Sequence, residues 1–268
     1  MMNKRLISSF ILGILVFFTI CFNWFAAIFI AIIVIRGLYE FFSMIERKGV
    51  YIYKYLGITI GALIPLSVYF RFEITKTWEL LFFGISILTL IILQLKREDH
   101  NQAIIGISST IFGIFYIAWF LSFFIKIKFL PFGTFHALAV IFITKSSDIG
   151  AYLIGSRFGK KPLIPKISPK KTVEGMVGGL LFSVIAALIF KLSLPFSFLH
   201  LLFIGLFLGL LGQLGDLFES LIKRDCNVKD SGSIFPGLGG ILDIIDSLLF
   251  TIPAYYFYIS IIYNNPII

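Results

Sequence analysis

Long apolar runs alternate with short polar breaks along nearly the whole sequence, from LISSFILGILVFFTI near the start to LLFTIPAYYFYISIIY near the end. A helix needs about 20 mostly apolar residues to cross a bilayer, and runs of this kind follow one another closely. The pattern predicts an all-α, polytopic integral membrane protein with about nine transmembrane helices. The predicted spans are residues 6–21, 24–43, 55–71, 79–95, 103–125, 134–155, 173–190, 198–222 and 241–262.

The composition agrees with a membrane protein, since 59% of the residues are hydrophobic and 17% are aromatic, well above the usage in soluble domains. Lys4 and Arg5 precede the first apolar run, as in a signal peptide, but no clear small-residue cleavage site follows. We therefore expect this run to remain as the first span. Cys21 and Cys226 lie in unrelated segments, so neither a disulfide framework nor a zinc site is predicted.

The basic residues test this division into spans, because Lys and Arg concentrate in the cytoplasmic loops of membrane proteins. With the N-terminus in the cytoplasm, 17 of the 23 Lys and Arg residues lie in inner segments and five in outer ones, while Lys145 lies inside a predicted span. An odd number of spans then places the C-terminus outside. The strongly polar connections 156–172 and 223–240 face the cytoplasm.

The fourteen acidic residues fall into two groups. Eight are expected in loops or at span ends, where they need no special role: Glu40, Glu46, Glu73, Glu79, Glu98, Asp99, Asp225 and Asp230. A carboxylate at the centre of the bilayer costs about 2.5–3.5 kcal/mol, so acids within or beside apolar segments are candidates for a shared polar site. These are Asp148, Glu174, Asp216, Glu219, Asp243 and Asp246.

Two segments predict that four of these acids converge. The segment GQLGDLFESLIKRD forms one polar helical stripe through its positions i, i+3, i+4 and i+7, which are Asp216, Glu219, Ser220 and Lys223. Asp243 and Asp246 begin the last span at the same membrane face. Oxygen ligands without nearby His or Cys suit Mg2+, and a second cation is left open. Alternatively, Asp243 caps its helix and Glu219 forms an ordinary ion pair with Lys223.

A basic segment, GSRFGKKPLIPKISPKKTVEGMVGG, leads into the seventh predicted span. Its three prolines oppose a helix, while Ser168, Pro169 as a first helical residue, and Thr172 predict a capped helix start that attracts phosphate. Electrostatic attachment to anionic lipids is the alternative. Lys145 and Asp148 lie one helical turn apart and are expected to neutralise each other, with a substrate role for Asp148 left open.

Three stretches together resemble the C-terminal half of the phosphatidate cytidylyltransferase family, the CDP-diacylglycerol synthases. They are SPKKTVEG (168–175), GDLFESLIKR (215–224) and KDSGSIFPGLGGILDIIDS (229–247). The family signature is carried here by Ser220, Lys223, Arg224, Lys229, Asp230, Gly232, Pro236, Gly239, Gly240, Asp243 and Asp246. Two positions depart from it: Leu238 stands where the family has His, and Ile244 where it has Arg.

The resemblance implies transfer of cytidylyl from CTP to phosphatidate, giving CDP-diacylglycerol and pyrophosphate, in a Mg2+-dependent homodimer of multi-span subunits. It also implies that Asp216 and Asp243 hold metal ions. The expected metal ligands are Asp216, Glu219, Asp243 and Asp246. The expected catalytic residues are Asp216, Asp243, Lys223, Arg224 and Lys229. The expected substrate-binding residues are Ser168, Lys170, Lys171, Thr172, Glu174, Ser220, Asp230, Gly239 and Gly240.

All of these motifs lie in the second half of the sequence. We therefore expect residues 131–268 to form a catalytic transmembrane region and residues 1–130 a transmembrane region of unassigned role. The expected location is the bacterial inner membrane, with the active site facing the cytoplasm and no nucleic-acid partner. Two alternatives are a CTP-dependent lipid kinase or a cytidylyltransferase acting on another lipid phosphate. A third, from another class, is an ion or proton transporter, since such proteins also use intramembrane acids.

Overall fold

The computed structural model describes residues 2–70, 75–98, 101–235, 237 and 239–264, and helices make up most of them. The helices are α1 (Met2–Cys21), α2 (Asn23–Glu46), α3 (Lys54–Tyr69), α4 (Thr75–Leu95), α5 (Ala103–Gly113), the π-helical η1 (Ile114–Trp119), α6 (Phe120–Lys128), α7 (Gly133–Phe158), α8 (Val173–Ile189), the 3-10 turn η2 (Phe190–Leu192), α9 (Phe198–Asp225) and α10 (Leu242–Asn264). One antiparallel hairpin joins β1 (Pro162–Ile164) to β2 (Ser168–Thr172).

Six helical segments in the described part of the chain are long and apolar enough to cross a membrane. They are Asn23–Glu46, Ala103–Lys128, Gly133–Phe158, Val173–Leu192, Phe198–Asp225 and Leu242–Tyr263. Three apolar helical stretches are shorter: Phe10–Cys21, Lys54–Tyr69 and Phe83–Leu95. The chain is thus a helical integral membrane protein, but the predicted count of about nine spans is not confirmed.

The all-α prediction is confirmed, and one short hairpin accompanies the helices in the described residues and accommodates the prolines of the basic segment. Pro162 pairs with Thr172, and Ile164 pairs with Ser168 across the two strands. Pro169, predicted as a first helical residue, lies instead in β2. The capping role of Thr172 is confirmed, because its side chain accepts a hydrogen bond from the N–H of Gly175 at 3.1 Å.

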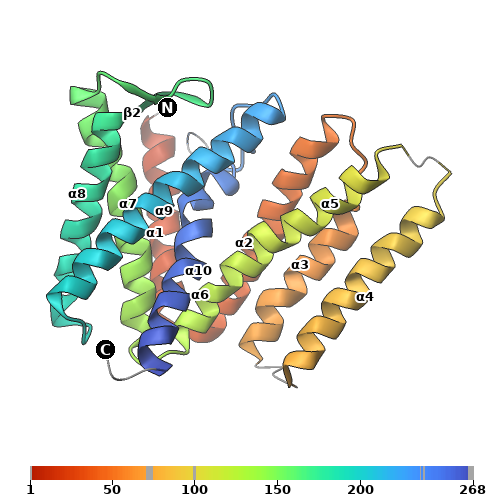
Figure 1. Ribbon diagram of the computed structural model, residues 1–268, viewed down its shortest axis with the longest axis horizontal. Coiled ribbons are helices and arrows are strands. Elements are labelled where there is room, and N and C mark those ends of the chain that lie inside the picture. The colour runs from red at the N-terminus through yellow and green to blue at the C-terminus, as the bar shows by residue number, and fades with distance from the viewer. Residues whose placement is uncertain (1, 71–74, 99–100, 236, 238, 265–268) are drawn as a thin grey trace. The chain divides into compact units, whose positions relative to one another are not determined.

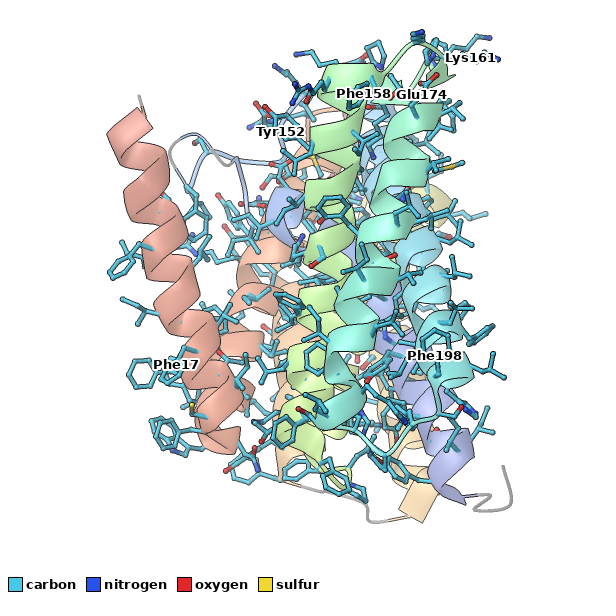
Figure 2. All side chains as sticks on the ribbon, turned by 90° about the vertical axis from the view of Figure 1, so that its left-hand side faces the viewer. Phe17, Tyr152, Phe158, Lys161, Glu174 and Phe198 are labelled. Carbon is cyan, nitrogen blue, oxygen red and sulfur yellow. The ribbon has the colours of Figure 1, made fainter. Side chains whose placement is uncertain are left out.

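The helix start of α8 also holds the hairpin. The carboxylate of Glu174 accepts hydrogen bonds from the backbone N–H groups of Lys160, at 3.0 Å, and Lys161, at 3.2 Å. Figure 2 shows Lys161 and Glu174 at the end of α7 where Phe158 lies, while Phe198, at the start of α9, lies toward the other end of these helices. The basic segment is therefore anchored at one end of the helix pair.

The chain forms two compact units. Unit 1 comprises Met1–Ile125 and Asp230–Leu242, and unit 2 comprises Lys126–Lys229 and Asp243–Ile268. In unit 1, α2 packs against α3, and α5 lies beside both of them (Figure 1). In unit 2, α7, α8 and α9 pack against one another. The predicted functional division at residues 130 and 131 stays a prediction.

Small residues allow the helices of unit 2 to approach closely. A Cβ added to Gly150 would lie 2.5 Å from Phe182, and one added to Gly178 would lie 2.5 Å from Ile154. A Cβ on Gly209 would meet the Ser183 hydroxyl at 2.3 Å. Helices in membranes associate through such small-residue contacts because lipid gives them no hydrophobic driving force.

Replacing Gly178→Ala should therefore destabilise unit 2 by about 1–3 kcal/mol, since the new methyl group overpacks the contact with Ile154. We expect a lower midpoint of thermal unfolding for the purified protein in detergent. The matched control is Gly84→Ala in α4, where an added Cβ meets nothing within 4 Å. Equal midpoints for the two variants would contradict the close packing of α7 on α8.

Candidate active site

A cavity of about 500 Å³ opens in unit 2 between the hairpin and helices α7, α8 and α9. Its lining brings together five of the predicted site residues: Ser168, Lys170, Lys171, Thr172 and Asp216. Asp148, Tyr152 and Gln213 also line it. The cavity lining therefore combines basic residues from the hairpin with carboxylates from two helices.

An ion pair connects the hairpin to α9 in the cavity lining. The Lys171 ammonium, on β2, lies 2.6 Å from the Asp216 carboxylate, on α9. Both side chains are half-buried, with 26% and 32% of their surface exposed. Arg224 adds a second connection, since its Nε donates to the carbonyl of Ile167 at 3.3 Å. The hairpin and the polar stripe of α9 are thus held together at the cavity.

A second lysine lies between two carboxylates. Lys223 Nζ is 2.9 Å from Glu219 and 2.6 Å from Asp243. The Glu219–Lys223 pair is the i, i+4 alternative predicted from the sequence, and the contact with Asp243 joins α9 to the first turn of α10. Glu219 is 1% exposed, and its Oε1 has no hydrogen-bond partner within the residues that the structure describes.

A third lysine, Lys145, is the centre of a hydrogen-bond network. The sequence predicted only one of its contacts, the pair with Asp148. Lys145 Nζ donates to Asp148, to the carbonyl of Ile244 and to Ser247 Oγ, each at 2.9 Å. Ser247 Oγ in turn donates to Asp148 at 2.9 Å. The expected pairing of Lys145 with Asp148 is confirmed. The connection from α7 to α10 was missed, because spacing along one helix carries no information about a partner about a hundred residues away.

Asp246 lies beside this network. It is 9% exposed, and its carboxylate accepts the backbone N–H of Ser247 at 2.6 Å. Its charge interacts with Lys145, Asp216 and Asp148. The acids of α7, α9 and α10 therefore share one electrostatic environment, in which lysine ammonium groups supply the opposite charge.

The chemistry of these side chains suits a hard divalent cation, since the donors are carboxylate oxygens and one of them, Glu219 Oε1, is buried without a partner. Among the described residues, however, no three His, Cys, Asp or Glu side chains gather as a metal site. Lys223 contacts Glu219 and Asp243 instead, and Lys171 contacts Asp216. The four predicted metal ligands stay a prediction.

The remaining predicted residues lie apart from the cavity lining. Glu174 binds the hairpin backbone, Ser220 follows Glu219 on α9, and Lys229 is exposed beyond the end of that helix. Asp230, Gly239 and Gly240 belong to unit 1. Their predicted substrate and catalytic roles stay predictions. Glu73, Asp99, Pro236 and Leu238 lie outside the described residues.

Glu40 corrects the sequence analysis, which gave it no special role. The structure places it inside α2 with 4% of its surface exposed. Its carboxylate accepts hydrogen bonds from Ser231, Ile241 and Leu242. The only sign of this role in the sequence was a charged residue six positions before the end of an apolar helix. Such a residue looks like an ordinary acid at the end of a span.

Residues 3–262 match the family model described as the cytidylyltransferase family. The chain belongs to the cytidylyltransferase family. A phosphatidate cytidylyltransferase of Thermotoga maritima is 34% identical over 87% of this chain and 86% of its own length. The phosphatidate cytidylyltransferase of Synechocystis is 30% identical over 98% of both chains. That of Bacillus subtilis is 46% identical over 54% of this chain, and the match spans 55%, about half, of the Bacillus protein.

Membership of the cytidylyltransferase family covers both units, because the matched residues extend from α1 to α10. The family resemblance stated from the motifs is therefore confirmed. At Ile244, one of the two departures from the family signature, the backbone carbonyl accepts a hydrogen bond from Lys145, a contact that does not depend on the side chain. The backbone at this position thus contributes to the charge network of the site.

Replacing Lys223→Met should destabilise the protein by about 3–5 kcal/mol, because it leaves Glu219 and Asp243 buried without their shared cation. We expect a lower midpoint of thermal unfolding in detergent. The control is Lys166→Met, which removes an exposed lysine from the hairpin and should change the midpoint little. A midpoint for Lys223→Met equal to that of the control would show that the cluster does not depend on this ammonium group.

Proposed function

We propose that this chain transfers the cytidylyl group of CTP to phosphatidate, forming CDP-diacylglycerol and releasing pyrophosphate. The proposal depends most on the ion pair in the cavity lining, where Lys171 of the basic hairpin meets Asp216 of α9. It places cationic and carboxylate groups in one open cavity of a membrane protein. The names of the Thermotoga and Synechocystis relatives agree with this reaction.

In this reaction a phosphate oxygen of phosphatidate attacks the α-phosphorus of CTP, and the bond from that phosphorus to the bridging oxygen of pyrophosphate breaks. Both reactants are anions, since a phosphate monoester carries a charge of about −1.5 to −2 at pH 7. Positive groups must therefore offset their repulsion. Lys170 and Lys171 line the cavity for this purpose. The nucleophile is already ionised, so no general base is required.

The ion pairs keep these lysines in place before substrate binds. Lys171 is held by Asp216, and Lys223 by Glu219 and Asp243. An ammonium group has three N–H donors, so a lysine that contacts one or two carboxylates can still donate to a phosphate oxygen. Groups that need no reorganisation during the reaction stabilise the developing charge most effectively.

The cavity lining also contains apolar side chains, as a lipid substrate requires. Leu163, Met176 and Leu217 line it together with the polar residues. Tyr152, which also lines it, is 73% exposed on α7. We propose that the acyl chains of phosphatidate remain in the bilayer beside these helices while the headgroup enters the cavity.

We further propose that Mg2+ takes part, held by Asp216, Glu219, Asp243 and Asp246, with a second cation left open. When bound, a divalent ion neutralises phosphate charge and favours departure of pyrophosphate. The unpartnered Oε1 of buried Glu219 supports this assignment. The lysines that contact these acids would keep their positive charge directed toward the phosphates.

The cellular arrangement is also a proposal. We propose a homodimer in a bacterial inner membrane, with the N-terminus in the cytoplasm, the C-terminus outside and the cavity open to the cytoplasm. The concentration of Lys and Arg in alternating segments supports this orientation. The hairpin, with exposed Lys166, and the exposed Lys160 and Lys161 just before it belong to the cytoplasmic side in this arrangement.

The test is an assay of the purified protein with phosphatidate and Mg2+, using CTP labelled either at the α-phosphorus or at the γ-phosphorus. We expect the α-label to appear in lipid and the γ-label in pyrophosphate. A γ-label in lipid would instead show a lipid kinase, and transfer only with another lipid phosphate would change the substrate. No transfer of either label would leave the transporter alternative and contradict the proposed reaction.

The same assay tests the carboxylates through Asp243→Asn. Removing this charge should lower turnover by about a hundredfold or more, as removal of an electrostatic group at a reacting centre does. The matched control is Asp225→Asn, at the exposed end of α9, which should keep wild-type turnover. Size-exclusion chromatography checks that both variants stay folded, and full activity of Asp243→Asn would refute the role of this acid.

A further inference from the structure

The start of α10 is held by a carboxylate from α2, far earlier in the sequence. Glu40 Oε1 accepts the backbone N–H of Ile241, and Oε2 accepts that of Leu242, both at 3.0 Å. The hydroxyl of Ser231 also donates to Oε2, at 3.0 Å. The first N–H groups of a helix have no partner within the helix, and here a distant side chain provides one.

Burial raises the free-energy cost of the Glu40 carboxylate and strengthens the hydrogen bonds that it accepts. Glu40 is 4% exposed, and the three groups that donate to it belong to residues that are themselves buried. An ionised carboxylate in an apolar helix requires several donors to offset its loss of water. Hydrogen bonds to a charged acceptor are roughly twice as strong as neutral ones. The segment that ends at Leu242 is thus fixed firmly to α2.

At two positions of the connecting segment a side chain would collide with Glu40, and at Gly240 also with the Ser231 hydroxyl. A Cβ on Gly240 would lie 2.4 Å from Glu40 Oε2, and a Cβ on Gly232 would lie 2.6 Å from Oε1. Gly239 has a different requirement, since its φ of +93° is strained for other residues. Gly232 and Gly240 therefore let the backbone fit closely around one carboxylate.

We propose that Glu40 is a positioning residue: by fixing the N–H groups of Ile241 and Leu242, it sets where α10 begins and hence which way Asp243 and Asp246 project. The inference rests on the proposed function, in which those two acids serve the reaction. Asp243 follows Leu242 directly in the chain. A slip of one residue at the helix start would turn both acids by about 100° around the helix axis.

This positioning role gives a function to the first half of the chain. The sequence motifs had assigned no role to that half. Unit 1 includes Asp230–Leu242 together with Met1–Ile125, and Glu40 is the carboxylate that connects the two stretches through Ser231, Ile241 and Leu242. The glycine-rich segment before α10 is thus positioned by α2. The first half serves the site by holding the beginning of the last helix.

The test compares Glu40→Gln with the wild-type protein. The amide keeps the volume and one acceptor oxygen but turns an NH2 group toward a backbone N–H. We expect kcat/KM for CTP to fall about ten- to a hundredfold, as small displacements of reacting groups do, with a several-fold higher KM. A lower amount of folded protein would not change KM. Hydrogen exchange at Ile241 and Leu242 should become faster, while exchange in α7 to α9 stays unchanged.

The matched control is Glu46→Gln, also on α2, where the side chain is 41% exposed and pairs with Lys54. It should leave both kinetics and exchange as in the wild type. Wild-type kinetics for Glu40→Gln, or slower kinetics without faster exchange at the two amides, would overturn the proposal.

A milder variant serves if Glu40→Gln does not fold. Ser231→Ala removes one hydrogen-bond donor to Glu40. It should reduce kcat/KM a few-fold and make hydrogen exchange at the Leu242 amide faster. Unchanged exchange at Leu242 would overturn the proposal. The exchange measurement does not require CTP. If the wild-type protein shows no cytidylyl transfer, the proposed function fails, while the anchoring of α10 by Glu40 is still tested separately.

Discussion

Charged side chains inside apolar helices must find partners, and the arrangement of this protein depends on that requirement. An unpaired carboxylate in such surroundings is too costly to keep. Here each buried or half-buried acid of unit 2 meets a lysine or a hydrogen-bond donor: Lys171 contacts Asp216, Lys223 contacts Glu219 and Asp243, and Lys145 contacts Asp148. In unit 1 the same requirement is met for Glu40 by three neutral donors.

These pairs also determine the geometry of the site, because their partners come from different elements. Lys171 connects the hairpin to α9, Lys223 connects α9 to α10, and Lys145 connects α7 to α10. Each pair therefore stabilises the packing and places a cation at the same time. For a reaction between two phosphate anions, a set of ammonium groups fixed in advance is the main chemical need. The compensation of buried charge and the proposed catalysis thus use the same contacts.

The sequence predicted those features that depend on local spacing. The apolar runs indicated a helical membrane protein, and the pairs Lys145–Asp148 and Glu219–Lys223 followed from helical periodicity. Features that depend on tertiary packing were missed. The hairpin was not predicted, because the prolines excluded a helix without indicating strand pairing. Glu40 resembled a residue at a span end, since its donors lie about two hundred positions later in the chain.

The ion pair of Lys171 and Asp216 in the cavity should act as one unit in the proposed cytidylyl transfer. The most direct measurement is a double-mutant cycle in kcat/KM for CTP with Lys171→Met, Asp216→Asn and the double variant. Residues that act together give non-additive losses. We expect the double variant to lose no more activity than the worse single variant. Losses that multiply would show that Lys171 and Asp216 act independently, and would refute their coupling.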